Sequence, residues 1–135
     1  MDIEKIIADL KQTWPILDIL TFDDLTIQDK LQKNSFHIIN FGEQYLKEKN
    51  RLNKLNQLRE KVAGECYHKY KTDNLELTKY EIEKYYLPKE PDIIKIDNEI
   101  YKQKIIVEFF EIAIDALKKQ QWNIKLFMED RKFGA

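Results

Sequence analysis

The segment from Ile105 to Leu117, which reads IIVEFFEIAIDAL, constrains the fold more than any other part of the chain. On a helix, its acidic residues Glu108, Glu111 and Asp115 fall within one arc of about 60° and every other position is apolar. The apolar arc therefore covers about 220°, whereas a surface helix that docks on one core needs a stripe of about 100°. Such a helix is expected to have two partners, its own subunit and a neighbouring copy.

Two other placements of this segment are weaker. It could be the central helix of a compact bundle. A membrane span is less favoured, because only 13 residues separate Lys104 from Lys118, whereas a span needs about 20 apolar residues. The acidic stripe would also be costly in lipid. We therefore predict an oligomer interface, with no membrane association, made by Ile105, Ile106, Phe109, Phe110, Ile112, Ala113, Ile114, Leu117, Trp122 and Phe127.

Composition favours a helical protein. The 135 residues suit one domain with room for an oligomerisation element. Charged residues make up 35% and hydrophobic residues 43%, while 3 glycines and 3 prolines are too few for a turn-rich β architecture. The single cysteine, Cys66, cannot form an internal disulfide, and no stretch resembles a signal or transit peptide. We expect an all-α protein in a reducing cytoplasm.

The N-terminal region, residues 1–70, is predicted to hold an acidic first helix and a long basic helix. Apolar residues recur at helical spacing in Asp2–Thr13, with Asp2 as the N-cap and Pro15 beyond the end. The following stretch, Ile16–Ile27, is expected to be an irregular connection. The long helix is expected to begin at Asn34 or Ser35, run to about Tyr70 and form an exposed arm.

The C-terminal half is predicted to contain a loop and two helices. Residues 71–90 form the connecting loop, with one short helical or extended piece around Tyr80–Leu87. Residues 91–135 form the oligomerisation region, in which Pro91 starts a long helix that runs to about Lys119. A polar break at Gln120-Gln121 would then precede a short terminal helix, Trp122–Phe133.

Charge is segregated along the chain although the net charge is only −1. Residues Met1–Asp29 contain 2 basic and 7 acidic residues, a net charge of −5. Residues Lys47–Lys71 contain 8 basic and 3 acidic residues, a net charge of +5. The basic window is either an ordinary solvated helix face or a surface for an acidic polymer, and a ring of subunits favours the second because the fields of its copies add.

The sequence predicts no enzyme, no metal site and no cofactor. It contains no HExxH, no CxxC, no glycine-rich phosphate loop and no nucleophile elbow. Cys66 and His68 are two positions apart on the expected helix and point in different directions. The carboxylates Glu108, Glu111 and Asp115 could bind a cation, but a solvated face explains them better.

Single-stranded nucleic acid is the better prospect. Lysines that contact phosphates and aromatic rings that stack on bases are typical of single-strand binding, although tyrosines at helical spacing are often core residues instead. Two groups mix these types, one around Tyr67–Lys71 and one around Lys79–Lys89, where Tyr80, Tyr85 and Tyr86 lie among lysines. The predicted phosphate contacts are Arg51, Lys54, Arg59, Lys61, Lys69 and Lys71, and the predicted stacking residues are Tyr67 and Tyr70.

The C-terminal third resembles the UvsY family, the recombination mediators of T4-like bacteriophages. The resemblance rests on a long helix with an apolar stretch, the box Trp122-Asn123-Ile124-Lys125 and the ending Arg131-Lys132-Phe133. Chain length and the order of parts also fit. The family's Lys-x-Arg pair, however, aligns with Gly64 and Cys66, so Arg59 and Lys61 would have to supply the charge, or the DNA contact has moved.

This resemblance implies an all-α, ring-like homo-oligomer of about six or seven subunits. It implies binding to single-stranded DNA, to the phage recombinase and to the phage single-strand-binding protein, and a role in loading the recombinase onto DNA covered by that binding protein. The alternative is a structural or adaptor helical oligomer that has protein partners only.

Overall fold

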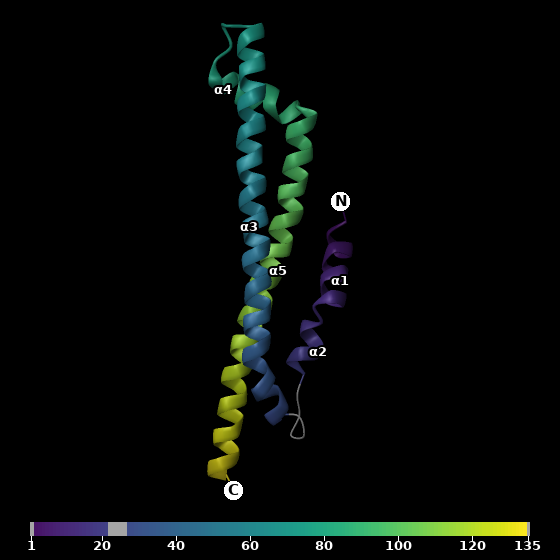
Figure 1. The fold of residues 1–135 in the computed structure, drawn as a ribbon, viewed down its shortest axis with the longest axis vertical. Helices are drawn as coiled ribbons and strands as arrows, with labels where there is room; N and C mark the ends of the chain where they lie inside the picture. The colour runs from purple at the N-terminus through teal and green to yellow at the C-terminus, as the bar shows by residue number, and fades with distance from the viewer. Residues whose placement is uncertain (1, 22–26, 135) are drawn as a thin grey trace. The chain divides into compact units, whose positions relative to one another are not determined.

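The computed structural model describes the backbone of residues 2–21 and 27–134 and the side chains of residues 2–21 and 28–130. Every regular element in this part of the chain is a helix, as predicted (Figure 1). The elements are α1 (Ile3–Thr13), α2 (Ile16–Leu20), α3 (Ile27–Asp73), α4 (Lys79–Glu81), the π-helix η1 (Ile82–Tyr86), the 3-10 helix η2 (Leu87–Lys89) and α5 (Pro91–Gly134).

The residues group by their contacts into two compact units. The aromatic-core unit comprises Asp2–Glu48 and the chain from Ile105 onward, and the connection unit comprises Lys49–Lys104. The predicted boundaries at residues 70 and 90 follow the order of elements along the chain. The contacts group the residues differently, because α3 and α5 each contribute to both units.

The aromatic-core unit is built around three aromatic rings. Phe41 and Phe110 are each 1% exposed and their ring centroids lie 6.0 Å apart. Trp14 meets both rings edge to face, at 5.0 Å from Phe41 and 5.3 Å from Phe110. Edge-to-face pairs add to the free energy gained by burying the rings. The buried members of this cluster are Ile16, Phe41, Phe110, Ala113 and Leu117.

Local sequence signals set α1 as predicted. The Asp2 carboxylate accepts a hydrogen bond of 3.2 Å from the backbone N–H of Lys5, which caps the helix. Pro15 disfavours helical backbone at Trp14, whose φ and ψ are −122° and 79°. The irregular connection predicted for Ile16–Ile27 is partly wrong, because α2 occupies its start and Ile16 packs into the core.

The start predicted for α3 is also wrong. Asn34 is an interior residue of this helix and is 1% exposed. Its side-chain N–H group donates to the Leu117 carbonyl at 3.2 Å and to Gln120 Oε1 at 3.0 Å. Tertiary contacts therefore engage the side-chain N–H group of the residue that the sequence suggested as a helix cap. The first part of α3 is accordingly a core helix and not the exposed arm that was predicted.

The predicted break at Gln120-Gln121 does not occur, since α5 is continuous to Gly134. Gln120 is 6% exposed and donates to the Leu20 carbonyl at 2.6 Å, so its polar group is buried rather than placed in a turn. Glutamine is also a good helix former. The short terminal helix is therefore the last part of α5. The side chains of Arg131-Lys132-Phe133 lie outside the described residues.

The connection unit pairs the C-terminal part of α3 with the N-terminal part of α5, and the predicted connection joins them at one end (Figure 1). Ile82, Leu87, Ile93 and Ile100 are buried. The connection begins with a capping box, in which Thr78 Oγ1 accepts from the Glu81 N–H at 3.1 Å and Glu81 Oε1 accepts from the Thr78 N–H at 3.3 Å. Pro91 starts α5, as predicted.

The wide apolar arc of α5 divides into covered and uncovered positions. Phe110, Ala113 and Leu117 are buried within the subunit's own core. Ile112 and Trp122 remain 64% and 63% exposed. The other predicted interface residues lie between these extremes: Ile105, Ile106, Phe109 and Ile114 are half-buried, and Phe127 is exposed.

Candidate nucleic-acid interface

Four of the eight predicted DNA contacts lie on one face of α3. At 100° per residue, Arg51, Lys54, Lys61 and Lys69 fall within an arc of about 80°, and all four side chains are exposed. We call these four residues the basic face. Glu65 shares the arc and is also exposed. The face therefore carries four positive charges against one negative charge, a net charge that favours contact with phosphates.

The other two predicted phosphate contacts are turned toward neighbouring elements. The Arg59 guanidinium lies against Asp97 on α5, with Nε 2.5 Å and one Nη 3.4 Å from the carboxylate oxygens. Its hydrogen bond to Asp97 raises the pKa of Arg59, so the group stays charged. Lys71 Nζ donates to the Leu77 carbonyl at 2.5 Å and so closes the start of the connection.

Tyr70 is also turned inward. Its ring lies 4.9 Å from the ring of Tyr86, and its hydroxyl donates to the Glu90 carboxylate. That hydrogen bond, together with burial, raises the pKa of Tyr70 to about 12, because ionisation would place two negative charges side by side. Tyr70 thus ties α3 to the end of the connection.

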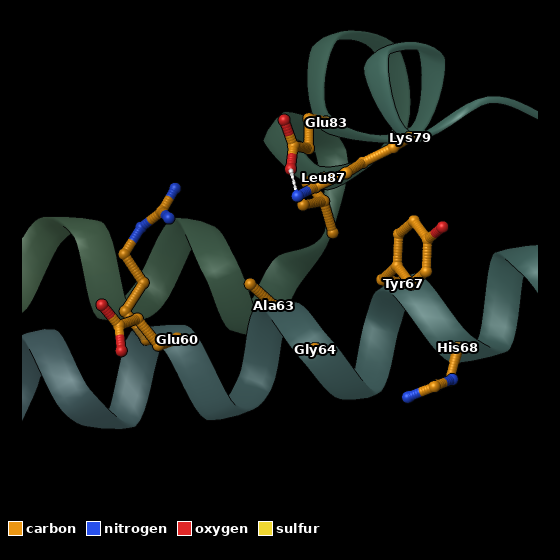
Figure 2. Close-up of a pocket in the computed structure, with 9 residues that line it drawn as sticks. Glu60, Ala63, Gly64, Tyr67, His68, Lys79, Glu83 and Leu87 are labelled. Atoms are coloured by element: carbon orange, nitrogen blue, oxygen red, sulfur yellow. Dashed lines mark ion pairs between the residues drawn. The ribbon is translucent and has the colours of Figure 1, made fainter.

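Tyr67, the second predicted stacking residue, lines a pocket of about 470 Å³ between α3 and the connection. Figure 2 shows its ring projecting from α3 toward Lys79, with Ala63 and Gly64 on the helix beside it. Lys79 Nζ lies 3.8 Å from a carboxylate oxygen of Glu83. The pocket therefore has the ring of Tyr67 on one wall and carries a positive charge at Lys79 and a negative charge at Glu83. Such a lining suits a polar, planar group.

Gly64 and Cys66 stand where the resemblance expects a basic pair, and their surroundings differ. A Cβ atom added at Gly64 would meet nothing within 4 Å, so a side chain can begin there without a clash. Cys66 is half-buried, and burial, helped by the carboxylates of Glu90 and Asp92, raises the pKa of its thiol. The thiol therefore stays protonated and is a poor nucleophile.

Only part of this arrangement was readable from the sequence. The spacing of Arg51, Lys54, Lys61 and Lys69 already predicts a shared helix face. The motif Thr78-x-x-Glu81 is a capping-box signal that could have fixed the start of the connection helix. No local signal could have placed Lys79, Glu83 and Leu87 across a pocket from Tyr67, because that juxtaposition depends on the path of the connection.

Other kinds of site find little support. Within residues 2–21 and 27–134 no group of three His, Cys, Asp or Glu side chains could hold a metal ion. No helix in the described part of the chain combines the length and apolarity that a membrane span requires.

Comparison with known proteins gives one consistent result. No protein-family model and no curated protein matches the sequence. A crystal structure of the bacteriophage T4 recombination mediator protein UvsY, in lattice type IV, aligns over 100% of both chains with a TM-score of 0.78 and 18% identity. This chain has the UvsY fold. UvsY in lattice type I aligns over 94% of this chain and 99% of its own, with a TM-score of 0.77 and 19% identity.

UvsY in lattice type II aligns over 99% of this chain and 98% of the other, with a TM-score of 0.75 and 20% identity. The fold expected from the C-terminal motifs is therefore confirmed along the whole chain. At this level of identity the likeness to UvsY concerns the fold.

Proposed function

We propose that this protein is a recombination mediator. It binds single-stranded DNA as a homo-oligomer and helps to load a phage recombinase onto DNA covered by a phage single-strand-binding protein. The observation that carries this proposal is the UvsY fold over the full length of the chain, because the crystallised T4 protein is a recombination mediator. The C-terminal motifs support the same role.

The basic face is the proposed main contact for the DNA backbone. Its four cations lie on an exposed surface of one long helix, where they can follow successive phosphates. Contacts with phosphates carry no sequence information, which suits a mediator that acts on any strand. Tyr67, at the adjoining pocket, is the proposed site for an unpaired base.

The proposed assembly is a ring-like homo-oligomer. Its support is the uncovered part of the apolar arc, where Ile112 and Trp122 keep most of their surface exposed on α5. Phe36, Ile39 and Leu46 on α3 are exposed in the same unit, at 65%, 61% and 65%. Burial of these side chains against other copies would remove apolar surface from water. Repeated basic faces then bind one strand together, so that weak sites give a high overall affinity.

We assign no catalysed reaction and no cofactor to this protein. Its proposed place of action is the cytoplasm of the host cell, where the strand and both protein partners would be found.

Salt dependence of DNA binding tests the proposal. Fluorescence anisotropy with a labelled oligonucleotide should show that affinity falls steeply with salt concentration. In Lys54→Ala/Lys61→Ala, the slope of log affinity against log salt should fall by roughly 0.7 for each lost phosphate contact. The matched control is Lys5→Ala/Lys11→Ala, which removes two exposed lysines from α1 and should leave the slope unchanged.

Two outcomes would contradict the proposal in different ways. Absence of any salt-sensitive binding by the unmodified protein would favour the adaptor that has protein partners only. An equal decrease of the salt slope in the basic-face variant and in its control would mean that the DNA contact lies elsewhere. A gain of affinity in Gly64→Lys, for which the structure has room, would support the placement independently.

Sedimentation equilibrium tests the assembly. Ile112→Glu should reduce the assembled mass, whereas Leu75→Glu, at a position 77% exposed in the connection unit, should not. A single-subunit mass for the unmodified protein at micromolar concentration would remove the ring from the proposal.

A further inference from the structure

Three tyrosines on the connection are exposed to solvent. Tyr80, at the start of the segment, is 63% exposed, and Tyr85 and Tyr86 in the π-helix η1 are 52% and 38% exposed. Several large aromatic side chains exposed over so short a stretch mark a surface that contacts a partner. None of these three residues belongs to the basic face or lines the pocket beside Tyr67.

Lys84 lies between two of the rings. Its Nζ atom is 5.2 Å from the centroid of Tyr80 and 5.4 Å from the centroid of Tyr85, and it donates a hydrogen bond of 2.9 Å to the Tyr80 hydroxyl. One ammonium group thus contacts two exposed aromatic faces. We call Tyr80, Lys84 and Tyr85 the tyrosine clamp.

Three carboxylates of the segment have local partners outside the clamp. Glu81 is held in the capping box with Thr78, and Glu90 accepts a hydrogen bond from the hydroxyl of Tyr70. Glu83 pairs with Lys79 at 3.8 Å. These three carboxylates bond to groups other than the two rings, and the cation that contacts both exposed rings is Lys84.

The connection is anchored beneath these rings. Ile82 is 0% exposed and Leu87 is 7% exposed, so one side of the segment is buried while the tyrosines point outward. The π-helix begins at Ile82 and ends at Tyr86, directly before Leu87, and π-helical turns are frequent at functional sites. Tyr86 is further supported by the ring of Tyr70 at 4.9 Å. An anchored aromatic ring loses less conformational entropy when a ligand stacks on it.

We propose that the tyrosine clamp is a second DNA contact, in which Tyr80 and Tyr85 stack on unpaired bases and Lys84 binds a neighbouring phosphate. The inference rests on the proposed function, because it presumes that single-stranded DNA is the ligand. A cation beside exposed aromatic faces is the combination that single-strand binding uses. Double-stranded DNA should bind the tyrosine clamp poorly, because the bases of a duplex are already stacked on one another and cannot stack on the tyrosines.

The test compares two labelled oligonucleotides of equal length, oligo-dT and an abasic strand with the same backbone. The unmodified protein should prefer oligo-dT, since stacking contributes roughly 5- to 150-fold in affinity for each base. In Tyr80→Leu/Tyr85→Leu this preference should fall by about fivefold or more, while the salt slope should stay the same. The matched control, Tyr80→Phe/Tyr85→Phe, retains the rings and should keep the preference.

Lys54→Ala/Lys61→Ala should behave in the opposite way, with a smaller salt slope and an unchanged preference for bases. The clamp is overturned if the leucine variant keeps the unmodified protein's preference, or if the unmodified protein binds the two strands equally. In both cases the salt slope still reports separately on the basic face. If neither strand is bound in a salt-dependent way, the proposed function fails and the clamp fails with it.

Circular dichroism of the leucine variant should match the unmodified protein, because both tyrosines are exposed.

Discussion

The aromatic-core unit and the connection unit are built from parts of the same two long helices, yet different contacts stabilise them. The first encloses Trp14, Phe41 and Phe110 and buries an amide network around Asn34 and Gln120. The second buries aliphatic side chains and exposes the rings of Tyr80 and Tyr85 and the four cations of the basic face. The comparison indicates a division of work. One unit supplies a core and the uncovered apolar positions proposed for assembly, and the other presents the cations and rings proposed for DNA.

Phe110→Ala should have the largest effect on stability. The side chain is 1% exposed and meets three other rings, so its loss should lower the free energy of unfolding by about 3–5 kcal/mol. Urea denaturation followed by circular dichroism measures the change, at one fixed protein concentration because association adds stability. Leu75→Ala, at a site 77% exposed in the connection unit, should change it by less than about 0.5 kcal/mol. Similar losses in both variants would refute the contrast between the units.

Gln120→Met should have the next largest effect. Methionine fills a similar volume but cannot donate to the Leu20 carbonyl or accept from Asn34, so these buried groups lose partners. The free energy of unfolding should fall by about 1–3 kcal/mol in the same denaturation assay. Its neighbour provides the control, since Gln121→Met removes an amide that is only half-buried and should have a smaller effect. Equal effects would mean that the network contributes no specific stability.

The ion pair of the connection unit should have the smallest effect. The side chains of Arg59 and Asp97 are 40% and 47% exposed, so water and salt screen their attraction. A double-mutant cycle with Arg59→Ala and Asp97→Ala should give a coupling of about 0.2–1 kcal/mol, and less at high salt. A coupling above about 2 kcal/mol would show that this surface pair is as important as a buried network.

Much of the fold followed from local patterns. Asp2 and Pro15 predicted the ends of α1, and Pro91 predicted the start of α5. The polar stretch after Tyr70 predicted that a connection separates the two long helices. These predictions succeeded because capping and proline restrictions depend on a few neighbouring residues. Two of the errors fell at Asn34 and Gln120, where a polar residue suggested a boundary but was buried against a distant carbonyl.

The candidate site was also predictable only in part. Helical spacing alone places Arg51, Lys54, Lys61 and Lys69 on one face. It could not show that Arg59 pairs with Asp97 or that Tyr70 donates to Glu90, because those partners lie on a different helix or at the far end of the connection.

The sequence by itself determined an all-α chain with a basic window and an apolar arc too wide for one surface stripe, since these properties follow from residue order and helical periodicity. Only the tertiary structure decided which parts of that arc are covered within the subunit, with Phe110 buried and Ile112 exposed. The physical reason is that burial depends on what packs opposite a side chain, which neighbours in sequence do not specify.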